Sequence, residues 1–184
     1  ATRETIEEAF QVAYDCDKLS AFGVIIAINR ECSEQMAQSI IDQKMFIEVL
    51  LAPSFTQKAL DLLKEKSNLR LLKMDGYSQG KSTLYRSVPS FDGLIVQNDD
   101  DRMIKEADLT VVTKTTPTQE QLRDLLFAWK VVKHTKSNAI VIAHDEKTLG
   151  IGAGQTSRVD AVWIAAKRAG ATMEGAVLAS DAFF

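Results

Sequence analysis

Residues 137–158 restrict the fold more than any other part of the sequence, because an apolar run, a set of glycines and a helical pattern follow one another there. The run 139–143 is rich in β-branched residues and predicts a strand. After a short polar turn, the glycine-rich segment 149–154 leads to a helix start at Arg158. Glycines leave backbone amides accessible and a helix N-terminus carries partial positive charge, so we expect this loop to suit an anionic or strongly polar ligand.

The rest of the chain alternates strand-sized apolar runs with helical periodicity, which predicts a layered α/β fold. Ser33 and the Pro117-Thr118 pair have the composition of helix starts. The polar, glycine-containing segment 75–83 predicts an exposed excursion. We expect helices over 6–14, 33–41, 56–66, 118–134 and 159–169, and strands over 23–29, 46–52, 69–74, 84–88, 93–97, 111–112, 139–143 and 175–179.

The longest expected helix carries an apolar stripe with one tryptophan, which predicts core packing rather than a ligand site. The chain has 184 residues and 46% hydrophobic content, enough for one sizeable core. We therefore expect a single region over 1–184, as one domain or as two packed lobes with a boundary near 114–136. The stripe consists of Leu122, Leu125, Leu126, Trp129 and Val132.

Composition argues against several classes of function. The net charge is -3 with acids and bases interspersed, so no basic stripe indicates nucleic-acid binding. The apolar runs fall far short of the roughly 20 residues that span a membrane, and no signal peptide is visible. Cys16 and Cys32 lack metal-site spacing, and His134 and His144 are too few to complete a metal cluster. Three successive aspartates at 99–101 predict a solvated turn. A reducing cytoplasm is the simplest location.

Several separate motifs, in one order, resemble the transformylase domain of the bifunctional purine enzyme that formylates aminoimidazole carboxamide ribonucleotide. They are KSNAIVIA, GIGAGQTSRVDA, APSF, LIVQNDD, VVTKTTPT and ASDAFF, and the resemblance covers essentially the whole chain. It implies formyl transfer from 10-formyltetrahydrofolate, as cosubstrate, to the exocyclic amine of the nucleotide, with no metal. It also implies a layered α/β/α, cytidine-deaminase-like fold, duplicated in the family as two lobes with a mixed sheet. The family forms homodimers with active sites at the subunit interface.

The resemblance assigns roles to two polar residues. Asn138 matches the active-site asparagine of the family, and its amide would donate to a developing oxyanion. The alternative is an asparagine that pins the start of a strand. Arg158 matches the arginine that binds the nucleotide's polar face, and its alternative is a surface arginine. A helix start is electrostatically poor for a cation, which favours the ligand role.

The resemblance also assigns binding roles to two aromatic residues and one acid. Phe22 and Phe183 match aromatics that line the ligand cavity, where a flat base or pterin would stack, although each taken alone reads as core. Glu48 matches an acidic position that faces the folate. Because it stands among apolar residues, we expect it to be buried, with a salt bridge as its alternative role. Phe22 and Glu48 would thus serve both substrate and folate. Secondary candidates beside these positions are Leu19, Ser20 and Asp181.

The chain also departs from the family pattern. The family's Lys-His pair for proton transfer precedes the position of Ala1, and further folate-site residues follow that of Phe184. The cyclohydrolase domain has no counterpart here, so ring closure to inosine monophosphate is not expected. General acid and base catalysis is worth roughly 10²- to 10⁴-fold per positioned group, so we expect little or no turnover. Lys133-His134 is expected to be a helix-end cation rather than a substitute for the pair.

Two other classes of function stay open beside formyl transfer. A noncatalytic nucleotide-binding or assembly module would keep the fold without the reaction. A dinucleotide-dependent oxidoreductase is suggested by three glycines after a strand, but GIGAGQ lacks the final glycine or alanine of that pattern. A zinc deaminase is disfavoured because no HxE with PCxxC signature occurs in the sequence.

Overall fold

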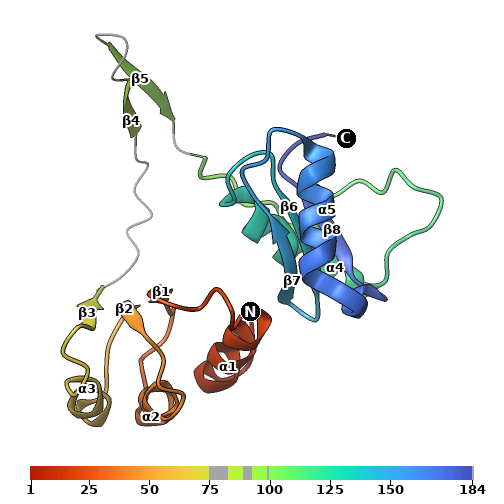
Figure 1. Ribbon diagram of the computed structural model, residues 1–184. Helices are drawn as coiled ribbons and strands as arrows, with labels where there is room; N and C mark the ends of the chain where they lie inside the picture. Colours follow the sequence, from red (N-terminus) through yellow and green to blue (C-terminus); the bar gives the residue numbers. More distant parts are fainter. Residues whose placement is uncertain (75–82, 89–92, 99, 184) are drawn as a thin grey trace.

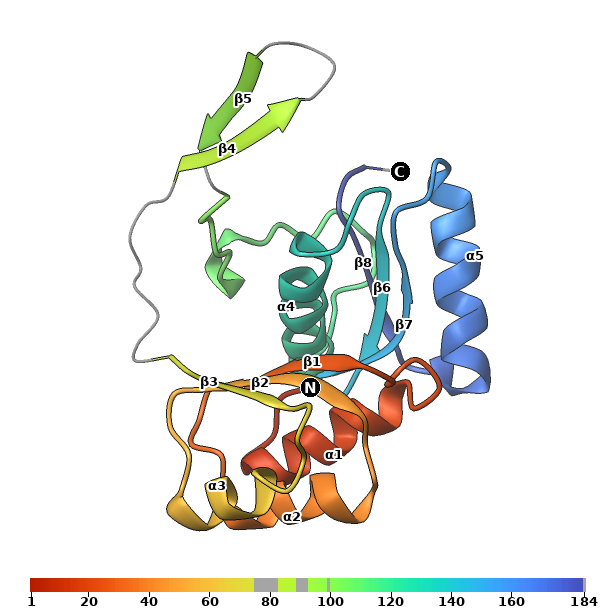
Figure 2. The same ribbon diagram turned by 60° about the vertical axis from the view of Figure 1, so that its left-hand side comes forward.

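The first half of the chain builds a parallel sheet covered by helices on one face. The computed structural model describes residues 1–74, 83–88, 93–98 and 100–183. Strands pair in the order β1-β2-β3, all parallel, which we call the parallel sheet. Figure 2 shows α1, α2 and α3 together beneath it. The elements are α1 (Ile6–Cys16), β1 (Val24–Ala27), α2 (Glu34–Asp42), β2 (Ile47–Ala52), α3 (Gln57–Leu63) and β3 (Arg70–Lys73).

Side-chain caps start the helices of this half, as the sequence predicts for Ser33. The Ser33 hydroxyl accepts from the Met36 amide at 3.1 Å, and Thr56 accepts from the Ala59 amide at 3.2 Å. Each cap satisfies a backbone donor that the first helical turn cannot pair. The apolar faces of the helices then meet the sheet in a core that includes the buried Met36, Ile40, Leu50 and Leu63.

The second half is a three-layer α/β/α arrangement around an antiparallel sheet of order β7-β6-β8. The central strand β6 (Ile140–His144) is apolar on both faces. Val141, Ala143 and the preceding Ala139 pack with α4 (Gln119–Lys133), whereas Ile140 and Ile142 pack with α5 (Arg158–Ala169). The alternation follows from the two-residue period of a strand. The remaining elements are β7 (Lys147–Gly152), β8 (Val177–Ser180), η1 (Glu106–Asp108) and η2 (Gly170–Met173).

The glycine segment is mostly strand, which corrects the expected loop over 149–154. Gly150 and Gly152 are buried in β7. A Cβ at these positions would lie 2.0 Å from the carbonyl oxygens of Ala165 and Ala161 in α5. These two glycines therefore allow the strand to approach the helix backbone closely, and their amides do not form a ligand cradle. Only Gly154, with φ +66°, lies in the connection that follows the strand.

Two further sequence expectations change. Val111 and Val112 belong to no strand, and Val112 is 89% exposed. Of the apolar stripe of α4, only Val132 is fully buried. Its other four members are half-buried and line an apolar groove beside residues 104–117. The expected excursion over 75–83 lies outside the described residues except for Thr83, which begins β4.

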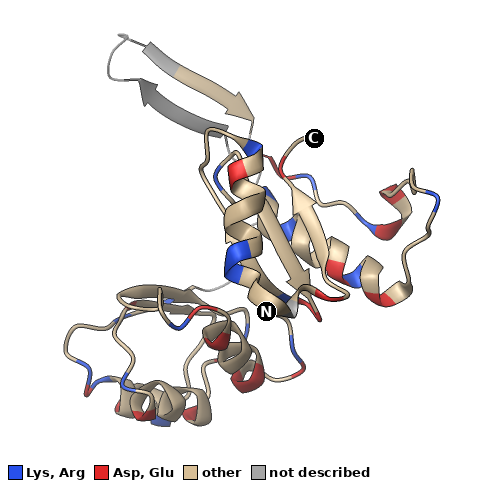
Figure 3. Ribbon diagram, turned by 45° about the vertical axis from the view of Figure 1, so that its right-hand side comes forward, with Lys and Arg blue, Asp and Glu red and all other residues tan. Residues whose placement is uncertain are grey.

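A hairpin links the two halves in sequence. It pairs β4 (Thr83–Val88) with β5 (Gly93–Asn98) in antiparallel register, and it stands apart from both sheets (Figure 1). Lys, Arg, Asp and Glu are distributed over the helices and loops of both halves (Figure 3). Among the described helices, none is long and apolar enough to cross a membrane. The class is α/β as expected, but each described sheet is wholly parallel or wholly antiparallel, which corrects the expected mixed sheet. The deaminase-like topology stays a prediction.

Contacts at the two ends of α1 join the halves. Before the helix, the Thr2 amide donates to the Glu146 carbonyl at 3.0 Å, and Arg3 pairs with Asp145 at 2.8 Å in the β6–β7 turn. After the helix, Asp17 pairs with Arg168 of α5 at 3.0 Å. The N-terminal helix therefore belongs to the core of the parallel sheet but is fastened to the antiparallel half.

Candidate functional site

Three of the polar residues singled out from the sequence meet at one end of the antiparallel sheet. Arg158 donates from Nη2 to Asn138 Oδ1 at 2.7 Å, and from Nη1 to Asp181 Oδ1 at 2.5 Å and Ser180 Oγ at 2.8 Å. The fold explains the meeting, because Asn138 precedes β6, Asp181 follows the neighbouring β8, and Arg158 opens α5. We call Asn138, Arg158, Ser180 and Asp181 the Asn138 cluster.

The side-chain amide of Asn138 is fully engaged within the protein. Its Nδ2 donates to the carbonyls of Gln155 at 2.8 Å and Thr156 at 3.1 Å, while its Oδ1 accepts from Arg158. Turning the amide over would set its NH₂ against the guanidinium, so this network fixes its orientation. These hydrogen bonds hold Asn138 in place, and donation to an oxyanion requires that a ligand replace one of the two carbonyls. The Ser137–Asn138 peptide bond is cis.

Asp181 supplies the charge that holds Arg158. Burial alone would raise the pKa of Asp181, but hydrogen bonds from Ser137, Arg158 and the Ala139 amide lower it to about 2. In this ion pair the side chain of Arg158 is 17% exposed and that of Asp181 is 15% exposed. The carboxylate therefore offsets the unfavourable position of a cation at a helix start. Asp181, a secondary candidate in the sequence, is central to the cluster.

The aromatic and acidic candidates lie elsewhere. Phe183 follows the cluster in sequence and is 89% exposed. Phe22, 79% exposed, precedes β1 in the parallel half and packs against Phe46 with ring centroids 4.9 Å apart. Glu48 on β2 is exposed, which corrects the expectation of a buried carboxylate in need of a salt bridge. Within β2, Glu48 is the exposed position, between the buried Ile47 and the half-buried Val49.

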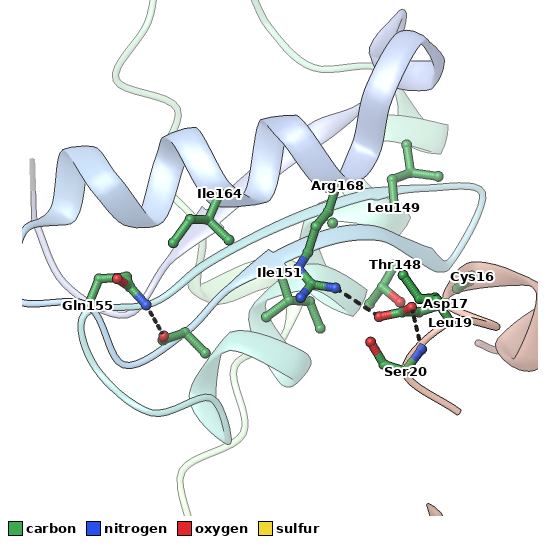
Figure 4. Close-up of a pocket in the computed structure, with 12 residues that line it drawn as sticks. Cys16, Asp17, Leu19, Ser20, Thr148, Leu149, Ile151, Gln155, Ile164 and Arg168 are labelled. Atoms are coloured by element: carbon green, nitrogen blue, oxygen red, sulfur yellow. Dashed lines mark hydrogen bonds and ion pairs between the residues drawn. The ribbon is translucent and has the colours of Figure 1, made fainter. Parts of the chain in front are cut away.

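A cavity of about 660 Å³ lies between the loop after α1 and the β7–α5 layer. Figure 4 shows Gln155 at one end and Asp17, Leu19 and Ser20 at the other. The size falls within the roughly 300–1,000 Å³ of small-molecule sites. Because the Gln155 carbonyl also accepts from Asn138, the cavity begins where the Asn138 cluster ends. Leu19 and Ser20 thereby join the candidate site from the parallel half.

Sequence reasoning missed a buried acid in α4. Asp124 is 5% exposed and accepts from the amides of Asp145 at 2.9 Å and Glu146 at 2.7 Å, with His144 Nδ1 at 3.5 Å. It holds the β6–β7 turn, where Asp145 and Glu146 have φ of 51° and 46°. A polar residue within an apolar helix face was the available signal. Among the described residues, no group of three His, Cys, Asp or Glu side chains is arranged to hold a metal ion.

Comparison with known proteins gives consistent matches. The model of the family described as "AICARFT/IMPCHase bienzyme" matches residues 1–168. The chain is 51% identical over 181 residues to the bifunctional purine biosynthesis protein PurH of Anoxybacillus flavithermus, covering 98% of this chain and 35% of the relative. The PurH of Acetivibrio thermocellus is 49% identical over 187 residues, covering 100% and 36%. The chain therefore spans about a third of the length of these relatives.

Proposed function

This chain belongs to the AICARFT/IMPCHase bienzyme family, and on that premise we propose that it carries part of a transformylase site. The reaction served is formyl transfer from 10-formyltetrahydrofolate to the exocyclic amine of aminoimidazole carboxamide ribonucleotide. The names of the relatives support purine biosynthesis. Because the chain spans about a third of their length, the activity of the whole protein is proposed here through the residues at hand.

The Asn138 cluster is the observation that carries the proposal. In formyl transfer the amine nitrogen bonds to the formyl carbon, an oxyanion forms, and the bond from that carbon to N10 of the folate breaks. The amine loses a proton and N10 gains one. Arg158 would orient the nucleotide, and Asn138 would donate to the oxyanion once the ligand displaces a carbonyl partner.

The cluster has no group suited to the proton transfers. The pKa of Asp181 is about 2, so its carboxylate stays ionised at neutral pH and serves to hold Arg158. His144 lies at the far end of β6 from Asn138, beside Asp124. An effective acid or base needs a pKa near the working pH. We therefore expect nucleotide binding by the cluster with little or no turnover.

The part of the site that contacts the flat base or pterin would consist of Phe22, Phe183 and Glu48. The two phenylalanine rings are mostly exposed, and Phe22 precedes β1 whereas Phe183 follows β8. Exposed rings of this kind suit surfaces that a ligand or a second subunit covers. We propose that Phe22 and Glu48 face the folate and that the functional form is a homodimer in the cytoplasm. The ligands are then a small-molecule nucleotide and a folate, without a metal, nucleic acid or membrane.

A noncatalytic nucleotide-binding or assembly module is the second candidate. The observation in its favour is that protein carbonyls already occupy both hydrogens of the Asn138 amide. Such a module would bind the nucleotide but never transfer the formyl group, even when an acid and a base are supplied in solution.

Calorimetric titration with aminoimidazole carboxamide ribonucleotide tests the proposal. We expect Asn138→Ala and Arg158→Ala each to weaken binding at least about tenfold, the loss expected for a charge-assisted contact. Lys167→Ala, an exposed cation further along α5, is the matched control and should leave the affinity unchanged. Absence of binding at millimolar nucleotide, or equal loss in the control, contradicts the proposal. A formyl-transfer assay with added imidazole as proton carrier separates the two candidates.

A further inference from the structure

We propose that Asp17 and Arg168 are positioning residues, whose ion pair sets where the 17–22 loop and its Phe22 ring lie relative to the Asn138 cluster. The inference rests on the proposed role of Phe22 at the folate. It concerns two residues that none of the sequence motifs singled out.

The 17–22 loop is ordered by its own hydrogen bonds. The Asp17 amide donates to the Tyr14 carbonyl at 3.3 Å as α1 ends, and Asp17 Oδ1 accepts from the Ser20 amide at 3.0 Å. The Phe22 amide then donates to the Ser20 carbonyl at 2.9 Å. A displacement of Asp17 is therefore passed along the loop to Phe22.

The far side of the loop is attached to the parallel sheet. Gly23, with φ +67°, donates its amide to the Phe46 carbonyl at 3.0 Å, and the Phe22 ring contacts the Phe46 ring. Neither attachment reaches the antiparallel half, where Asn138 and Arg158 lie. The position of Phe22 relative to the cluster thus depends on the contacts that join the two halves, and the Asp17–Arg168 pair is the one that the loop itself makes with α5.

Arg168 reaches the loop from α5 across the mouth of the cavity. Figure 4 shows its guanidinium extending from the helix to the Asp17 carboxylate, while Asp17 contacts Ser20 with its other oxygen. The cavity of about 660 Å³ otherwise separates the loop from the helix and from Gln155. Hydrogen bonding by Ser20 and the charge of Arg168 both lower the pKa of Asp17, so the pair stays charged at neutral pH.

The exposure of the pair argues for positioning rather than stability. The side chains of Arg168 and Asp17 are 53% and 45% exposed, and exposed pairs contribute little to the free energy of unfolding. Arg168 uses a single nitrogen in this contact, so a lysine at position 168 retains the essential charge. The conservative variant Arg168→Lys should therefore keep the contact with Asp17.

The test measures the affinity of the 184-residue chain for 10-formylfolate, beside hydrogen exchange of the Ser20 amide. We expect Arg168→Gln and Asp17→Asn each to raise the Kd about threefold, the size an exposed ion pair allows, with no further loss in the double variant. Arg168→Lys should restore the affinity. Lys167→Gln, which removes the neighbouring exposed charge on α5, is the matched control and should change nothing.

The outcomes separate this inference from the proposed function. If the unaltered chain binds 10-formylfolate and Arg168→Gln binds equally well, the positioning role is wrong. If the unaltered chain does not bind 10-formylfolate, the proposed folate site is wrong. The positioning role of the ion pair is then tested by hydrogen exchange of the Ser20 amide alone. Faster exchange at Ser20 in Arg168→Gln than in Lys167→Gln then supports positioning, and equal exchange overturns it.

Discussion

The Asn138 cluster and the 17–22 loop place side chains for a ligand in different ways. Arg158 and Asp181 are mostly buried, and every polar group that orients Asn138 is paired within the antiparallel half. In the loop, Leu19 is 94% exposed, and an exposed ion pair provides the direct link to α5. The cluster therefore acquires its geometry when the half folds, whereas the loop depends on weak contacts and on what covers it.

The largest effect should come from the packing beneath the cluster. A Cβ in Gly152→Ala would overlap the Ala161 carbonyl oxygen at 2.0 Å, so β7 and α5 must separate. We expect a loss of about 3 kcal/mol in the free energy of unfolding, measured by urea denaturation. Gly154→Ala is the control, because its φ of +66° costs only about 1 kcal/mol. Equal losses would show that close packing of β7 on α5 does not support the cluster.

Removing the charge at the centre of the cluster should cost less. Asp181→Ala leaves Arg158 and the Ala139 amide without their shared acceptor. We expect a loss of about 2 kcal/mol, because a hydrogen bond to a charged group is lost and its donors stay half-buried. Denaturation of Asp17→Ala in parallel should show a change of about 0.5 kcal/mol or less, as its pair is exposed. Comparable losses would remove the contrast between the two regions.

The Asp181 carboxylate should make the free energy of unfolding depend on pH in the acid range. The pKa of Asp181 in the folded protein is about 2, below its ordinary value of 3.8, so the contribution is complete above that value. It is lost as pH falls toward 2, because protonation removes the acceptor of Arg158. Urea midpoints from pH 5 to pH 2 should fall more steeply for the unaltered chain than for Asp181→Asn. Parallel curves would mean that Asp181 titrates normally.

The smallest effect on stability is expected in the loop. Phe22→Ala removes a ring that is 79% exposed, so the free energy of unfolding should change by about 0.5 kcal/mol or less. Affinity for 10-formylfolate should fall clearly if the ring stacks on the pterin. A large loss of stability would instead assign Phe22 to the core, which is the role its sequence context alone suggested.

Local sequence signals predicted much of the fold. Ser33 and Thr118 start helices as expected, because a hydroxyl that caps a first turn needs only residues three positions away. The motifs also brought Asn138 and Arg158 into one candidate site, where the structure joins them. The strand predicted over Val111 and Val112 was wrong, because β-branched residues form a strand only where another strand can pair with them.

The misread residues depend on contacts between distant segments. Gly150 and Gly152 were predicted to be a loop because their packing partners lie in a distant helix. Ala161 and Ala165 of α5 are four residues apart, so they lie on one face of the helix, and the two glycines are two residues apart, so they lie on one face of the strand. These two faces of small residues were a signal, present in the sequence, that the strand packs closely on the helix. The exposure of Glu48 depends on the tertiary packing of β2, and the pairing of Asp17 with Arg168 depends on how the halves meet. No local pattern encodes either.

The most direct test follows the Asn138 side-chain amide and the Ser20 backbone amide in one ¹⁵N-labelled sample titrated with aminoimidazole carboxamide ribonucleotide. We expect slow exchange of both Asn138 amide hydrogens before ligand is added, and saturable shifts of that signal as the nucleotide displaces a carbonyl partner. We expect faster exchange at Ser20 throughout. An Asn138 signal that stays unmoved at millimolar nucleotide, or that exchanges as fast as Ser20, would contradict a prebuilt nucleotide site at the cluster.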